Sequence, residues 1–175
     1  MSTPAVETFQ IADVICDLIK DQLSLDDSQV WIYNQKARIP NEPGLFVTVE
    51  LQAARSFGTS SLCGNDDAGN FCEFQSVNMQ EIYVVKLFSR DESALQRAPE
   101  VQMALSGVAA QQMCEQYCFR LGPLSVNVVD TSAVEASARL FRQDITFNAL
   151  RHYNKTRVID YYDRFSIPPS IHTNQ

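Results

Sequence analysis

Two strand-like runs joined by a proline-containing connection constrain the fold of this chain most strongly. Residues 30–33 are β-branched and aromatic, and residues 45–51 alternate with the period-2 pattern of a half-buried strand. Pro40 and the Pro43-Gly44 pair stand between them, where proline removes a ladder donor and glycine tolerates turn dihedral angles. The segment therefore predicts a strand, a turn and a second strand, arranged as a hairpin.

Length and composition are those of one ordinary globular domain. The chain has 175 residues, of which 45% are hydrophobic and 20% charged, so it can bury a single core. No run approaches the roughly 18 apolar residues of a membrane-spanning helix, and no signal-peptide pattern precedes the first helical segment. We expect one soluble cytoplasmic domain over residues 1–165, followed by a polar tail at 166–175.

Helix signals predict two long helices. A threonine–proline start signal and apolar residues spaced by three and four predict a first helix over residues 4–22. The capping-box spacing at residues 89–92 predicts the start of a second helix. Pro99 should kink or restart this helix, which the four-residue apolar spacing then extends to Tyr117.

Alternating patterns predict further strands. Residues 77–88 form a long strand whose second half is apolar on both faces, which predicts a central place in the sheet, between a helix and a second layer such as another subunit. A short strand is expected at 124–129 and a third long strand at 139–153. Asn154-Lys155 is interpreted as a turn, and residues 157–165 as a further extended segment. These elements together predict an α+β domain.

Residues 56–76 differ in composition from the rest of the chain, because they are rich in glycine, serine, threonine, asparagine and aspartate. They predict a long loop or an extended hairpin arm, and connections of this length are usually functional. Asp66 and Asp67 lie in a turn-like, solvated context. Two interpretations stay open, a tolerated surface insertion or a contact arm that reaches a neighbouring subunit or another component of an assembly.

Charge is divided unevenly along the chain. The net charge is −7, made up of −10 over residues 1–138 and +3 over residues 139–175. A pI near 4.7 argues against a sequence-specific DNA-binding protein, although an acidic surface suits a passage through which DNA slides. The basic side chains of the last segment are Arg139, Arg142, Arg151, Lys155, Arg157 and Arg164.

The basic segment has two main interpretations. Charges on an exposed strand edge prevent aggregation. Alternatively, the basic face of one copy docks on the acidic remainder of the next copy, in a head-to-tail contact that closes into a ring. Nucleic-acid contact is a third and weaker interpretation, because the rest of the chain is acidic.

Catalytic and metal-binding signals are weak. Only two histidines are present, and neither a nucleophile elbow nor a glycine-rich phosphate loop appears. The five cysteines are an odd number in a chain without an export signal, which predicts reduced thiols. Cys114 and Cys118 share a helix face and Cys63 and Cys72 bracket the arm, so four thiolates are available for zinc, but the spacing favours buried core residues.

Short motifs in a fixed order resemble those of the bacteriophage neck or tail-terminator proteins. They follow a first helix and precede a long strand, a long helix and a late strand, so the resemblance covers residues 11–153. The motifs are Asn34-x-x-x-Arg38-x-Pro40, Pro43-Gly44-x-Phe46-Val47-Thr48 and Arg55-x-x-Gly58-Thr59.

The resemblance implies an α+β fold in which helices flank a mostly antiparallel sheet, with no catalysis and no cofactor. It implies a ring of six copies at the top of the tail tube, with DNA passing through the lumen. The implied partners are other copies of the chain, the tail tube protein and a head-completion, connector or collar protein, and the resemblance also admits a sheath protein. Sequence-specific nucleic-acid binding and membrane binding are not implied, and the implied location is the virion after assembly in the host cytoplasm.

Candidate interface residues follow from the motifs, the arm and the basic segment. They are Arg38, Arg55, Gly58, Thr59, Asp66 and Asp67, together with the basic residues Arg139, Arg142, Arg151, Lys155, Arg157 and Arg164. One alternative is a stopper-like head-completion or adaptor protein of the same neck. A small cysteine-dependent metal enzyme is the other, and it requires the cysteines to cluster.

Overall fold

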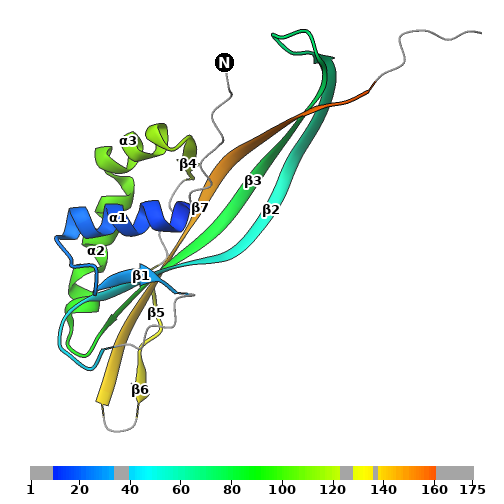
Figure 1. Ribbon diagram of the computed structural model, residues 1–175. Helices are drawn as coiled ribbons and strands as arrows, with labels where there is room; N and C mark the ends of the chain where they lie inside the picture. Colours follow the sequence, from blue (N-terminus) through cyan, green and yellow to red (C-terminus); the bar gives the residue numbers. More distant parts are fainter. Residues whose placement is uncertain (1–9, 34–39, 123–127, 136–137, 161–175) are drawn as a thin grey trace, which may run out of the picture.

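A computed structural model describes residues 10–33, 40–122, 128–135 and 138–160 (Figure 1). Helices cover one face of a mostly antiparallel sheet over part of its length, which confirms the α+β prediction. The helices are α1 (Ile11–Leu23), α2 (Ser93–Ser106) and α3 (Val108–Gln116). The strands are β1 (Val30–Ile32), β2 (Phe46–Asn65), β3 (Phe71–Ser89), β4 (Phe119–Leu121), β5 (Val128–Asp130), β6 (Ala133–Glu135) and β7 (Ala138–Val158).

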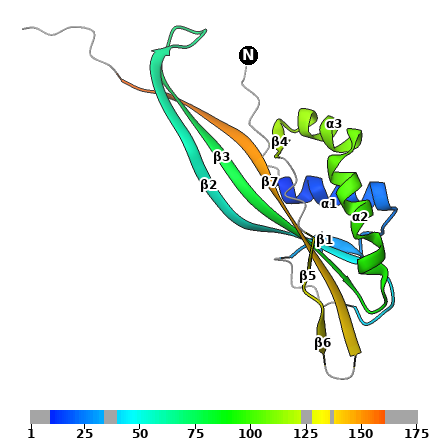
Figure 2. The same cartoon turned by 180° about the vertical axis from the view of Figure 1, so that it is seen from behind.

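Three long strands form the frame of the sheet, whose order is β1-β2-β3-β7-β4. β3 pairs antiparallel with β2 on one side and with β7 on the other, which confirms the long strand expected at 77–88 in a central position. β5 and β6 also pair with β7, near the end opposite the arm (Figure 2). β5 overlaps the strand expected at 124–129, of which residues 123–127 lie outside the described part of the chain.

The expected hairpin between the first two strands is wrong, because β1 runs parallel to β2. Val30 lies opposite Val47, and the Val47 amide donates to the Gln29 carbonyl at 2.7 Å. This register places Val30, Val47 and Val49 together in the core that α1 covers. The connection with Pro40 and Pro43-Gly44 therefore returns the chain to the starting end of the first strand.

The main core lies between the helices and one face of the sheet. Ile15 and Ile19 of α1 are fully buried, as are Val85 of β3 and Phe147 of β7. Tyr83 stacks on Phe147 with a centroid distance of 5.6 Å and joins the two central strands. We call this side of the sheet the helix face and the opposite side the far face, on which Phe46, Phe88 and Leu140 form a smaller cluster.

The second long helix is not confirmed as one helix, because Gly107 divides it into α2 and α3. Pro99 lies inside α2 and does not end it, whereas Gly107 is extended, with ψ of 172°. The Ser106 hydroxyl donates to the Gln102 carbonyl at 2.8 Å in the last turn of α2. The break therefore lies at the glycine.

The helix starts differ in part from the expected ones. Ser89 does contribute to the start of α2, since its hydroxyl accepts from the Ala94 amide at 3.0 Å. The second acceptor is the Asp91 carboxylate, to which the Ser93 amide donates. Asp91 thus takes the capping role that the sequence had predicted for Glu92, whose side chain makes no capping hydrogen bond. α1 begins at Ile11, and the earlier part of the helix expected at 4–22 lies outside the described residues.

No helix in the described ranges is long and apolar enough to cross a bilayer.

The polar stretch at 56–76 is an extended hairpin and is not a loop. β2 and β3 stay paired through it, with one bulge between Ser56 and Gly58, and only residues 66–70 turn the chain. β7 adds a third strand as far as Val158. The turn expected at Asn154-Lys155 is wrong, because these residues pair with Ser76 and Gln75 of β3.

Candidate functional site

The part of the sheet that extends beyond the helices is the main candidate for interaction. We call it the arm and define it as residues 51–65 of β2, 71–83 of β3 and 148–158 of β7. It projects away from the helix-covered body in both views (Figures 1 and 2). Cross-strand polar pairs such as His152 with Asn78, at 2.7 Å, join its strands, so the arm is a ribbon with little core of its own.

A buried polar cluster joins the arm to the body. The Glu81 carboxylate accepts a hydrogen bond from the Tyr83 hydroxyl at 2.6 Å and one from the Tyr153 hydroxyl at 3.1 Å. The Arg151 guanidinium lies 4.6 Å from the centre of the Tyr153 ring. Burial and the bond to Glu81 raise the pKa of Tyr83, and burial followed by the Glu81 charge raises that of Tyr153. Both tyrosines therefore stay protonated as donors, and the Tyr153 bond joins β7 to β3, whereas the Tyr83 bond lies within β3.

The far face of the arm carries apolar side chains near its tip. Leu62, Phe74 and Val158 lie on three neighbouring strands and have exposed fractions of 69%, 37% and 64%. The alternation along each strand places them on one side, because Leu62 faces Phe74 directly and Val158 pairs with Cys72, two residues from Phe74. This patch, the tip patch, has no covering element in the described part of the chain.

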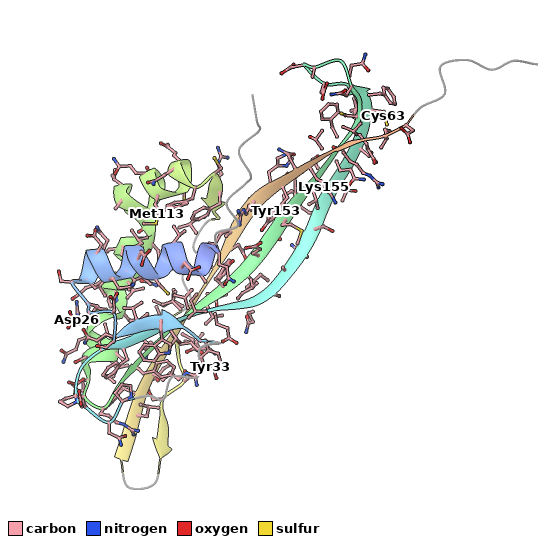
Figure 3. All side chains as sticks on the ribbon, viewed as in Figure 1. Asp26, Tyr33, Cys63, Met113, Tyr153 and Lys155 are labelled. Atoms are coloured by element: carbon pink, nitrogen blue, oxygen red, sulfur yellow. The ribbon has the colours of Figure 1, made fainter. Side chains whose placement is uncertain are left out.

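The other face of the arm is polar. A shallow groove of about 700 Å³ crosses the three strands and is lined by Ser61, Gln75, Lys155 and their neighbours. Figure 3 shows Lys155 between Tyr153 and the end of the arm that carries Cys63. The arm therefore presents two chemically different faces, one polar and one apolar at the tip.

The turn at the tip is built on Asp66. Its carboxylate accepts hydrogen bonds from the Asn70 side chain at 3.1 Å and from the Asn70 and Ala68 amides at 2.8 and 3.0 Å. Gly69 takes a positive φ of 81°, which glycine adopts without steric cost. The bond from the Asn70 side chain, followed by that from its amide, lowers the pKa of the Asp66 carboxyl. The carboxylate thus closes the turn.

Both edges of the arm leave backbone groups available. β1 pairs with β2 only at residues 47–49, and β4 pairs with β7 only at residues 149–151. Among the residues that the structure describes, no strand pairs with the outer edge of β2 beyond Val49 or with that of β7 beyond Arg151. Such edges are templates for pairing with another chain.

A second candidate surface is a groove between α2, α3 and β4, which we call the helix groove. Its volume is about 990 Å³, and its wall includes the buried Leu105 and Phe119. Met103 stands on its rim and is 62% exposed, although it is apolar. Glu115 and Arg120 supply opposite charges at the same groove. This hollow is suited to an apolar side chain with charged neighbours.

On the body, the far face carries paired charges. Lys86 forms an ion pair with Glu50 on the neighbouring strand, and its ammonium lies 4.2 Å from the centre of the Tyr33 ring. Arg142 pairs with Asp144 at 3.1 Å. These charges are already neutralised within the chain.

The candidate residues from the motifs that resemble those of phage neck proteins lie near the base of the arm where they are described. Arg55 donates to the Gln80 side chain at 2.7 Å on the far face, and Gly58 lies opposite Asn78 beside a bulge in β2. A Cβ atom at Gly58 would lie 3.3 Å from the Asn78 amide nitrogen, so the glycine permits close packing. Thr59 is exposed and pairs with Val77, whereas Arg38 lies outside the described residues.

The basic residues of the last segment do not form one continuous face. Arg142 is paired on the far face of the body, and Arg151 is buried at the base of the arm. Lys155 and Arg157 lie exposed along the arm. The hydrogen bond from Ser61, followed by that from Gln75 and by the charge of Arg157, lowers the pKa of Glu73. The Arg139 side chain and the whole of Arg164 lie outside the described parts. Asp66 is used within the tip turn, and Asp67 is exposed beside it.

The five cysteines do not gather in one place in the fold, although Cys114 and Cys118 both line the helix groove. Cys16 is buried in α1, where burial raises the pKa of its thiol to about 12. Cys63 and Cys72 lie in the arm, and Cys72 donates weakly to Asp66 at 3.7 Å. Cys118 follows α3 in a left-handed conformation, so it does not share a helix face with Cys114 as expected. Within the described ranges, no three histidine, cysteine, aspartate or glutamate side chains gather to hold a metal ion.

Sequence reasoning missed the Glu81 cluster and the helix groove. Glu81 and Tyr83 stand two positions apart on one strand face, so their spacing gave a usable signal for a contact. The groove depends on the bend at Gly107, and no sequence pattern places α3 against β4.

No known protein-family model matches this chain, and no curated protein matches its sequence at a significant level. The resemblance to phage neck proteins therefore rests on short motifs in the sequence.

Proposed function

We propose that this chain is a structural protein of a tailed-bacteriophage neck, in the role of tail terminator. Six copies form a ring that caps the tail tube and joins it to the head-completion or connector protein. The ring surrounds a lumen through which DNA passes. No catalytic step belongs to this role.

The observation that carries the proposal is the arm. Its three strands project beyond the helices, and its two outer edges continue past the last strands that pair with them in the described part of the chain. A chain with two such edges aggregates unless the edges are covered, and a closed ring covers every edge with the next copy. β2 and β7 run in the same direction, so the edge of one copy can meet the other edge of the next in the same sense around a ring.

The motif residues support the same role. Arg55, Gly58 and Thr59 lie where β2 leaves the body and enters the arm, beside its bulges. Bulges re-aim a strand, and glycine permits close approach of a neighbour. The residues that resemble the terminator motifs thus lie where the bulges of β2 set the direction of the arm.

Charge also supports the role. The net charge of −7 gives a ring of copies a strongly acidic total. Phosphates are repelled by such a surface, so DNA would pass a lumen of this sign without binding tightly.

Light scattering and negative-stain imaging of the purified protein test the proposal. A terminator is expected to form open-centred particles of about six times the 19.7 kDa chain mass, either alone or on the end of assembled tail tube. When added to growing tube protein, it should stop elongation. Rings of another symmetry that bind the connector and leave tube growth unchanged would favour the adaptor role.

A further inference from the structure

The outer half of the arm has an unpaired strand edge on each side. We call residues 58–64 of β2 the β2 edge and residues 152–158 of β7 the β7 edge. Both pair with the same residues of β3, 72–78, without a bulge. In the described part of the chain, β1 has ended at the level of Val49 and β4 at that of Arg151. The two edges are therefore equally long, lie at the same level and have no outer neighbour there (Figure 1).

The β2 edge carries none of the features that protect an exposed strand edge. Charged side chains, proline and bulges are the usual means by which proteins prevent such edges from pairing. Residues 58–64 include no charged residue and no proline, and the bulge between Ser56 and Gly58 comes before them. The glycines at both ends of this edge, Gly58 and Gly64, also permit close approach of another backbone. The β2 edge is therefore suited to pairing with a further strand.

The β7 edge is basic, which disfavours pairing with its own kind. Lys155 and Arg157 lie on the same face of this edge, and an antiparallel pair of two β7 edges brings these cations together. On the corresponding face, the β2 edge carries the uncharged Ser61 and Cys63. No like charges meet when the β7 edge of one copy lies beside the β2 edge of another.

Exposed apolar side chains lie on both edges and on the same face of the arm. Leu62 is 69% exposed on β2, and Val158 is 64% exposed on β7. Within one copy β3 separates them, so they lie two strand spacings apart, about 10 Å. When the β7 edge of one copy meets the β2 edge of the next, these side chains lie on adjacent strands and cover each other. A second copy therefore matches both edges in charge and in apolar surface.

We propose that residues 152–158 of one copy pair in parallel with residues 58–64 of the next copy, so that the arms join into one continuous sheet. The pairing is parallel because β2 and β7 run in the same direction. The faces of a sheet continue from strand to strand, so Cys63 of one copy lies on the same face as Lys155 and Arg157 of its neighbour. This contact adds strands, direction and faces to the proposed function, and it rests on that function only for closure into a ring.

Single cysteines along β7 test the contact against the native Cys63, which is exposed. A disulfide needs Cα atoms within about 7 Å and Cβ atoms that point toward each other. Oxidation of the assembled protein should therefore link Cys63 to the new thiol of Lys155→Cys or Arg157→Cys. Asn154→Cys and Thr156→Cys are the matched controls on the opposite face, and their yield should be about tenfold lower or less.

Further controls assign each link to two copies. Glu73 lies between Cys63 and Arg157 within one copy, a separation of about 10 Å, so a disulfide between these positions joins two copies. Every variant carries Cys118→Ser, which removes the other exposed thiol. Adding Cys63→Ser to Arg157→Cys should abolish the link. Mass spectrometry of mixed isotopically light and heavy protein identifies the linked peptides, and thermal unfolding confirms that each variant folds.

Links at position 155 or 157 that are absent at 154 and 156 support the continuous parallel sheet. Rings that link at neither face, or equally at both, overturn the edge contact and leave the terminator ring in place. Links of Cys63 to Cys63 in the parent protein show that β2 pairs with β2, and they overturn it as well. Open filaments with links on the expected face keep the contact and contradict the closed ring. Protein that stays monomeric and unlinked, with and without tail tube, overturns both.

Discussion

Tyr153 on β7 donates its hydroxyl hydrogen to the Glu81 carboxylate on β3 at 3.1 Å, where the arm leaves the body. Tyr83 donates to the same carboxylate from the same strand. The packing of the body ends at this point, and beyond it the arm is held mainly by the ladder and by polar pairs. The cluster therefore fixes the register at which the arm begins.

Replacing the acceptor should weaken the whole domain. Glu81→Ala leaves two tyrosine hydroxyls without their acceptor, so we expect the free energy of unfolding to fall by about 2–3 kcal/mol. Tyr153→Phe removes one donor and should cost about 1 kcal/mol. Chemical denaturation measures both, with Tyr33→Phe as the control at a half-exposed ring. A loss below about 0.5 kcal/mol for Glu81→Ala would show that the cluster is not structural.

The same cluster predicts alkaline sensitivity. The pKa values of Tyr83 and Tyr153 are raised in the folded chain above the ordinary value of 10.0. A raised pKa contributes stability that is complete below pH 10 and is lost as the pH rises toward the folded value. Denaturation midpoints measured from pH 8 upward should decline above about pH 10. If the decline is as steep in the Tyr83→Phe Tyr153→Phe double variant, other groups cause it.

Acid should loosen the tip turn. The pKa of Asp66 is lowered below its ordinary value of 3.8, so its contribution is present above that pH and is lost as the pH falls through the folded value. Hydrogen exchange at the Ala68 and Asn70 amides, corrected for intrinsic pH dependence, should therefore accelerate below about pH 4. Asp67→Asn is the matched control and should retain this behaviour, whereas Asp66→Ala should exchange rapidly at every pH.

The ion pair between Lys86 and Glu50 on the far face is partly buried, so the effects of replacing its two members should not be additive. Side-chain exposures are 13% for Lys86 and 24% for Glu50. Lys86→Met leaves the carboxylate unpaired and should cost about 1–2 kcal/mol, and Glu50→Gln in the same chain should restore part of it. The exposed pair of Arg97 and Glu100 supplies the control, where Glu100→Gln should change stability by less than about 0.5 kcal/mol. A double-mutant cycle without coupling would contradict this account.

The break between α2 and α3 should depend on Gly107. A Cβ atom there would lie 3.0 Å from the Met103 carbonyl oxygen, so Gly107→Ala forces the end of α2 to shift. We expect a loss of about 1 kcal/mol and an altered helix groove. Reaction of Cys118 with a thiol reagent reports the change in the groove, and Ala109→Gly, in the same helix pair, is the comparison.

The sequence predicted the elements better than their pairing. Period-2 alternation identified the strand at 77–88, because a half-buried strand must alternate. The parallel pairing of Val30 with Val47 was missed, since a proline-containing connection is compatible with either direction. The polar composition of residues 56–76 left loop and hairpin open, because a ribbon exposed on both faces needs few apolar residues.

For the candidate site, the arm could be predicted from the sequence. The faces on which the basic residues lie and the helix groove could not. The basic residues of the last segment looked continuous in sequence, but the strand period separates Arg142 from Arg151 onto opposite faces. The helix groove depends on the bend at Gly107 and on the three-residue strand β4. Both are too short to give a periodic pattern in the sequence.

The mass of the purified protein in solution, measured by light scattering together with negative-stain imaging, tests the terminator role directly. A tail terminator is expected to form open-centred, sixfold rings of about six times 19.7 kDa, alone or on the end of tail tube. A protein that remains a monomer in the presence of tail tube and does not limit tube length would contradict it.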